Sequence, residues 1–439
     1  MSSTSRKSET EPLRVSSAQD YRVPAIWLVA NVALAAIAFA LFLGRLVINH
    51  SNNLGDWGYS AGEWLINYQG GFVRRGLLGE LLTLFPDGRQ LTMTELWVAG
   101  VWLGVVAAFA LLIGRTIRHT HSPWPLAFWM VISGFVLSQS QSLWQPFWVS
   151  VTQFPARKEN LFYLLALVLA LLCHRALSRN AYWVALAVSG LVLAASAFVH
   201  EAFTLPLAVS AAVLLGVAGR ELTVRARIAG AAILLATGLV ASVAVLVVSR
   251  QVGDADAVWY AVGQPVRTWL LSGGHGALTG RADAMSYLNQ DAASSFEVVN
   301  ELLIGSNLWW WWLLTAVLLT SGTALLFWAL DRRWGSMRRN GLIFLGIAAP
   351  MLPLFVVAYD WGRFLAFILT LGTITALTVL NTRPRGDVAP LTARWLAVVG
   401  VVLAAMALVG LPEVGDPRGV IVPAESPADS VRMSNQLRY

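Results

Sequence analysis

Charged and polar side chains occur in four short clusters, each at the end of an apolar stretch of the chain. The carboxylates could take a proton from a hydroxyl group, and the cations could stabilise a phosphate that leaves during group transfer. The candidate catalytic residues are Asp56, Glu63, His200 and Glu201. The candidate phosphate-binding residues are Arg74, Arg75, Arg157, Lys158 and Arg363, with Asp360 and Asn160 as further candidates. If the four clusters meet on one face, they line one polar cavity.

The first cluster lies in a glycine- and aromatic-rich segment, 48–93. Its leucines between positions 77 and 84 predict a short amphipathic helix that lies on the membrane surface. Arg74 and Arg75 stand at the start of that helix. A helix start with two guanidinium groups is suited to an anion such as phosphate. The alternative is that both arginines contact lipid headgroups.

The later clusters separate apolar runs that follow each other closely. His200–Glu201 stands between two such runs, which demands a tight turn, and Asp360–Arg363 stands between two others. Ionisable groups at membrane depth are costly and are therefore functional candidates. The alternatives are a polar turn at the interface for the first pair and a local ion pair closing a hairpin for the second. The long loop 250–306 contains apolar stretches and is expected to fold as a lid with short helices.

The elements that position these clusters are apolar stretches long enough to cross a membrane. The chain has 439 residues, of which 57% are hydrophobic and only 13% charged, against about 25% charged in soluble domains. The predicted spans are 24–47, 94–114, 124–142, 160–174, 181–199, 202–218, 228–249, 307–330, 342–359, 364–380 and 395–411. The predicted fold class is therefore all-α, a polytopic membrane helix bundle of about eleven spans with outer loops and the short surface helix.

Arginine and lysine in the short loops set the expected orientation. They place the N-terminus in the cytoplasm of a cell whose inner (plasma) membrane the chain crosses many times. The predicted organisation is a disordered cytoplasmic tail over 1–22, a transmembrane bundle over 23–411 and an outer C-terminal tail over 412–439. The bundle carries outer loops at 48–93 and 250–306. The tryptophan run 309–312 suits an aromatic belt where a span begins on the outer side.

Several function classes are disfavoured. The single cysteine, Cys173, excludes a disulfide framework and a cysteine metal site. The net charge of +7 is scattered between apolar runs, so no nucleic-acid partner is expected. No Walker motif, His-Glu-x-x-His motif or persuasive Ser/His/Asp arrangement occurs, and no metal ligands are assigned.

The plan of the chain resembles the GT-C superfamily of polytopic membrane glycosyltransferases. The resemblance covers residues 24–220 and rests on Asp56 after the first span, the aromatic–glycine segment 68–82, and the polar stretch 153–160 before an apolar run. It implies a polyprenyl-phosphate-linked sugar donor, a glycan or lipid acceptor, contact with membrane lipids, and Asp56 as the leading general base. The family's usual second acid is replaced by Gly58, so the need for a divalent metal cofactor stays open.

Two other functions fit the same features. An O-antigen or exopolysaccharide polymerase or ligase is also polytopic, with outer arginines and a large outer loop. A secondary transporter would show internal repeats and helices broken at the midplane. No convincing repeat is found, and the charges lie at the ends of spans.

Overall fold

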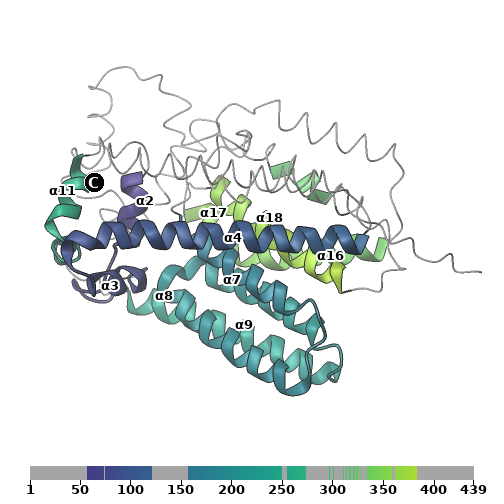
Figure 1. Cartoon of the computed structure of the whole chain (residues 1–439). Helices are drawn as coiled ribbons and strands as arrows, with labels where there is room; N and C mark the ends of the chain where they lie inside the picture. The colour runs from purple at the N-terminus through teal and green to yellow at the C-terminus, as the bar shows by residue number, and fades with distance from the viewer. Residues whose placement is uncertain are drawn as a thin grey trace, which may run out of the picture.

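The computed structural model of the chain describes residues 57–73, 75–120, 157–249, 255–272, 334–357 and 361–382, with scattered positions between 296 and 327. Within these residues every regular element is a helix and none is a strand (Figure 1). The predicted all-α fold class is therefore confirmed for this part of the chain.

Five helices form the body of the described bundle. They are α4 (Gln90–Thr120), α7 (Glu159–Leu172), α8 (Arg179–Ala218), α9 (Val224–Val248) and α18 (Trp361–Asn381). The shorter elements are α2 (Trp57–Trp64), α3 (Leu77–Thr83), η1 (Asp87–Arg89), α10 (Ala255–Tyr260), α11 (Gln264–Ser272), α16 (Trp334–Ala348), η4 (Ala349–Met351) and α17 (Leu354–Val357).

Three described helical segments are long and apolar enough to cross a membrane: Asp87–Thr116, Arg179–Ala218 and Val224–Val248. The helix α7 and the apolar part of α18 are shorter. The predicted spans 24–47, 124–142 and 395–411 lie outside the described residues. Membrane helices are thus supported, whereas the total of about eleven spans stays a prediction.

The helix α8 is a hairpin rather than a straight rod. His200 has a non-helical backbone (φ −166°, ψ 101°). The hydroxyls of Ser196 and Thr204 lie 3.1 Å apart, whereas eight residues of straight helix would separate them by about 12 Å. At the far ends of the two halves, the Leu177 N–H donates to the Ala218 carbonyl over 2.9 Å. The tight turn predicted at His200–Glu201 is therefore confirmed, and each half is about 27 to 32 Å long.

The helix α9 packs closely along α8 because glycines face it. A Cβ atom at Gly238 would lie 2.7 Å from the Cβ of Ala208 on α8, and one at Gly230 would overlap the Tyr182 hydroxyl. Small residues allow this approach, as is common between membrane helices. Together with α7, the helices α8 and α9 lie on one side of α4 (Figure 1).

The helices α16 and α18 run antiparallel, as a hairpin between the predicted spans 342–359 and 364–380 requires. The Phe344 ring lies against Gly372, while the Phe355 and Phe364 ring centroids are 5.6 Å apart. Residues 358–360, which join the two arms, lie outside the described part.

Hydrogen bonds align several helix ends at one level of the bundle. Asn381 donates to the Thr116 hydroxyl over 2.9 Å, and Arg220 donates to the Thr382 carbonyl over 3.1 Å. Arg115 donates to a carbonyl of α7. We call this level the arginine end. The start of α7 and the turn of α8 therefore lie at the other end, which we call the polar end.

Candidate functional site

The segment after α2 is fixed by one buried amide. The Asn67 side chain donates to the carbonyls of Leu65 (3.1 Å) and Val258 (3.0 Å), and it accepts from the Gln69 N–H (3.0 Å). Val258 belongs to α10, so the start of the long loop 250–306 is tied to the segment 48–93. The helices α10 and α11 agree with the short helices expected in that loop.

The loop from Tyr68 to α3 is closed by Glu80. This carboxylate accepts from the Tyr68 N–H (2.9 Å) and from the Gln69 amide (2.7 Å). A Cβ atom at Gly79 would overlap the Ile66 carbonyl, so α3 lies directly on the chain that follows α2. Burial, together with the Glu80 charge, raises the pKa of Tyr68 to about 12. Glu80 thus ties the start of the loop to α3.

The helix α3 is the short helix that the leucines predicted. It buries Leu78 and Leu82 and leaves Leu81 41% exposed, and Leu84, directly after the helix, is 77% exposed. The expected anion site at its start stays a prediction, because Arg74 lies outside the described residues. The helix has seven residues, Gly76 provides no side-chain cap, and the Arg75 guanidinium faces two carboxylates. The location of α3 on a membrane surface stays a prediction.

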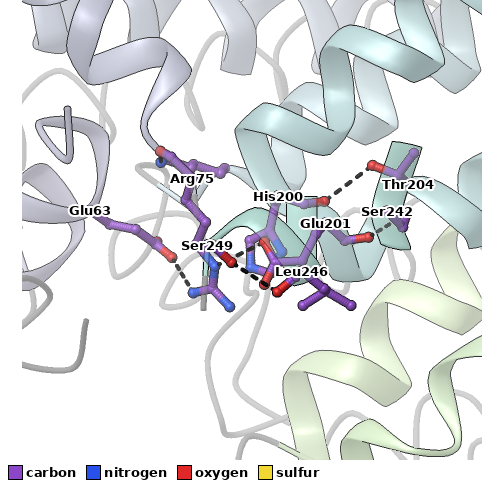
Figure 2. A network of polar contacts seen from close by, with 9 residues as sticks. Glu63, Arg75, His200, Glu201, Thr204, Ser242, Leu246 and Ser249 are labelled. Atoms are coloured by element: carbon purple, nitrogen blue, oxygen red, sulfur yellow. Dashed lines mark hydrogen bonds and ion pairs between the residues drawn. The ribbon is translucent and has the colours of Figure 1, made fainter. Parts of the chain in front are cut away.

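Arg75 lies between two buried carboxylates at the polar end (Figure 2). Its Nη1 is 3.5 Å from Glu63 Oε1, and its Nε is 3.6 Å from Glu201 Oε2. Arg157 reaches the other oxygen of Glu63, with Nη1 3.9 Å away. The Arg75 side chain is 25% exposed, whereas those of Glu63 and Glu201 are 2% and 5% exposed. The cation is thus the part of this group nearest to solvent.

Lys158 is fully buried and contacts the backbone of Arg75 rather than its guanidinium. Its Nζ donates to the Arg75 backbone carbonyl over 2.9 Å, and Arg75 has a positive φ of 69°. Burial lowers the pKa of Lys158 to about 8, while Glu63, Glu201 and Glu159 act in the opposite direction. Lys158 precedes α7, and it therefore ties that helix to the loop before α3.

The described charges of this group balance. The group comprises the carboxylates Glu63, Glu159 and Glu201 and the cations Arg75, Arg157 and Lys158, which we call the charge cluster. Asn160 is buried beside it at the start of α7. Burying charged side chains is costly unless they are paired. The opposite charges of this cluster allow its side chains to stay ionised while shielded from water, where they could contact a ligand.

The turn of α8 contributes His200 and Glu201. Both side chains are buried, so an exposed polar turn at the interface does not describe them. The His200 ring lies 4.2 Å from the Phe203 ring, and its carbonyl accepts from Thr204. The Glu201 carbonyl accepts from Ser242 of α9 over 3.1 Å (Figure 2). These bonds fix the turn between two helices and aim Glu201 at Arg75.

Sequence reasoning missed an aromatic layer beside the charge cluster. Phe203 and Phe367 have centroids 4.4 Å apart, Tyr163 stacks on Phe367 at 5.3 Å, and Phe162 and Phe364 complete the contacts. The signal was present in the sequence, because an aromatic residue follows each of three polar clusters within three positions. The layer adjoins the site, because the Phe203 ring also contacts the His200 ring.

Other predicted site residues are not placed. Asp56, Arg74 and Asp360 lie outside the described residues, as does the side chain of Arg363, whose backbone is in the first turn of α18. Within the described ranges no group of three His, Cys, Asp or Glu side chains is arranged to hold a metal ion. The structure thus brings together Glu63, Arg75, Arg157, Lys158 and Glu201, with His200 and Asn160 beside them.

Comparison with protein-family models identifies a family of membrane proteins. A family model described as "Uncharacterised membrane protein Rv1490" matches residues 27–294. No curated protein and no solved structure matches the chain. The matched range includes α2 to α11 and therefore every member of the charge cluster.

Proposed function

We propose that this chain, which belongs to the Rv1490 family of membrane proteins, is a glycosyltransferase. It moves a sugar from a polyprenyl-phosphate carrier to a cell-envelope glycan or lipid acceptor on the outer face of the plasma membrane. The observation that carries the proposal is the charge cluster: buried carboxylates and cations, drawn from segments far apart in sequence, at one end of an apolar helix bundle.

The reaction needs the chemistry that these groups supply. The acceptor hydroxyl oxygen attacks the anomeric carbon, the bond from that carbon to the phosphate oxygen breaks, and the phosphate leaves on the lipid. A carboxylate takes the hydroxyl proton. A guanidinium stabilises the negative charge that develops on the leaving phosphate. Both types of group lie within one salt-bridged network, so one substrate can contact them together.

Roles follow from exposure and pairing. Arg75 is the most exposed member of its ion pairs and would meet the phosphate. Glu63 is held by two guanidiniums, Arg75 and Arg157, which suits an anchor. Glu201 adjoins the turn of α8 and suits the proton acceptor. Asp56, which the superfamily resemblance favours as base, is the competing candidate.

The transporter alternative gains no support from α8. Transporters bind substrates where helices break near the midplane. The break at His200 instead joins two antiparallel halves at their common end. A polymerase or ligase would use the same cluster, and the size of the transferred group separates it from a glycosyltransferase.

The test is transfer in proteoliposomes. The purified protein is given polyprenyl-phosphate sugars and a membrane lipid extract, and mass spectrometry follows release of the polyprenyl phosphate and the mass added to the acceptor. We expect one sugar per turnover, which is lost in Glu201→Gln and kept in the control Glu80→Gln. Loss in Asp56→Asn with activity in Glu201→Gln would reassign the base. Absence of transfer by the wild type from every donor would overturn the proposal.

A further inference from the structure

We propose that Lys158 is a positioning residue that holds Arg75 between Glu63 and Glu201 only while its ammonium group is protonated. The charge cluster would then respond to pH through a residue that touches no substrate. The link to activity rests on the proposed function, whereas the link to the placement of Arg75 does not.

The first step is the backbone of Arg75. Its φ of 69° is in the left-handed region, which residues other than glycine adopt rarely because Cβ approaches the following carbonyl oxygen. Such a conformation persists only where the surroundings hold it. The Arg75 carbonyl accepts from the ammonium of Lys158 at 2.9 Å, and that bond holds it in place.

The second step is the charge on the donor. A hydrogen bond from an ammonium group is roughly twice as strong as one between neutral groups. A deprotonated Lys158 would still reach the carbonyl, but with a weaker bond. The left-handed backbone would then lose much of its support.

The third step is the balance of charge around the amine. The groups that act on Lys158 are Glu63 from α2, Arg75 from the loop, Glu201 from α8 and Glu159 from α7, with Arg157 next to it in the chain. Loss of the Lys158 proton would leave three carboxylates facing two guanidiniums. Burial lowers the pKa of Lys158 to about 8, so this loss falls just above neutral pH.

As pH rises, deprotonation of Lys158 should increase the stability of the protein but weaken the placement of Arg75. The pKa of Lys158 in the folded protein, about 8, is below its ordinary value of 10.5. The unfolded chain therefore binds more protons between these pH values, and the contribution of Lys158 to stability rises with pH across that window. If Lys158 had only a structural role, the free energy of unfolding would rise above pH 8 and nothing else would change. If Lys158 positions Arg75, the placement of Arg75 should weaken over the same pH range.

The experiment measures exposure of the Arg75 guanidinium directly. The full-length protein in detergent is treated briefly with phenylglyoxal, and peptide mass spectrometry gives the ratio of adducts at Arg75 to adducts at the exposed Arg89. Both sites feel the same reagent and pH. Because Arg75 is only 25% exposed and paired with two carboxylates when held, its release should raise the ratio.

The variants are Lys158→Met, which removes the charge, and Lys158→Arg, which keeps it at all pH values used. We expect the wild-type ratio to rise with a midpoint near pH 8, to be high and constant in Lys158→Met, and to be low and constant in Lys158→Arg. A wild-type ratio that does not change between pH 7 and 9.5 overturns the inference, even if Lys158→Met fails to fold.

The activity arm separates this inference from the proposed function. If the wild type transfers sugar, its kcat should fall above pH 8 while its unfolding temperature does not fall, and Lys158→Arg should remove that decline. If no donor is used but the adduct ratio titrates near pH 8, the proposed function fails and the positioning role stands. If sugar is transferred but the adduct ratio is independent of pH, the positioning role fails and the proposed function stands.

Discussion

Replacement of Glu63 by glutamine should destabilise the protein through buried cations: Arg157 loses the charge of a carboxylate partner, and Lys158 loses a carboxylate that favours its charged form. The change keeps the shape of the side chain and removes its charge. Glu63 is 2% exposed and pairs with Arg75 at 3.5 Å and with Arg157 at 3.9 Å. Arg75 keeps its ion pair with Glu201 and is 25% exposed. Loss of the Arg75–Glu63 ion pair therefore costs little, about 0 to 1 kcal/mol. Arg157 is 7% exposed, and removing one partner of a buried ion pair costs about 3 to 5 kcal/mol.

We therefore expect Glu63→Gln to lower the free energy of unfolding by about 3 kcal/mol, the lower end of that range, because glutamine can still accept a hydrogen bond. The matched control is Glu80→Gln. Glu80 accepts two hydrogen bonds and, among the described residues, has no cation within ion-pair distance. Its replacement should cost about 1 kcal/mol.

The assay is titration of the detergent-solubilised variants with SDS, followed by tryptophan fluorescence. The difference of about 2 kcal/mol between the two variants corresponds to about 30-fold in the unfolding equilibrium. If Glu63→Gln and Glu80→Gln unfold at the same SDS fraction, the ion pairs of Glu63 do not carry the stability assigned to them.

Three further predictions test the packing and the orientation. Gly79→Ala should reduce folded yield in size-exclusion chromatography, because its Cβ would overlap a backbone carbonyl, whereas Gly88→Ala, with open space around it, should not; equal yields would refute the contact. Ser210→Ala removes a 2.7 Å hydroxyl bond to α18 and should shift SDS unfolding by only about 0.6 kcal/mol; a shift of several kcal/mol would contradict this. In a background lacking the single cysteine, Gly88→Cys should react with an impermeant maleimide added outside whole cells and Arg118→Cys should not, and the reverse pattern would invert the predicted topology.

Much of the bundle could be predicted because hydrophobic length is a local property of the sequence. The stretches 94–114 and 364–380 lie within α4 and α18. The helix boundaries were less well predicted, since polar residues can continue a helix beyond the apolar run. The helix α4 starts at Gln90 and continues through Arg118. Likewise α16 begins at Trp334, eight residues before the apolar run that predicted it.

The candidate site was predictable in residue type but not in pairing. Charges at the ends of spans are visible in the sequence, and the tight turn at His200 followed from the distance between two apolar runs. The contact of Lys158 with Arg75 joins residues 83 positions apart, and no local pattern specifies it. The positive φ of Arg75 also has no sequence signal, because arginine rarely adopts it. The sequence therefore suggested Arg75 as a phosphate ligand, which stays a prediction, but it did not reveal the carboxylates that Arg75 pairs with.

The hairpin of α8 has a consequence for how the protein is made. Its two halves meet at a single non-helical residue, His200, so no connecting loop exists that could cross the membrane separately. We therefore expect both halves to enter a membrane together, as one unit. Glu201 travels at the tip of that hairpin, and the partners that neutralise it from the N-terminal side, Arg75 and Lys158, have already been synthesised when it arrives. Because Arg75 and Lys158 precede Glu201 in the chain, these cations are synthesised before the carboxylate that they neutralise.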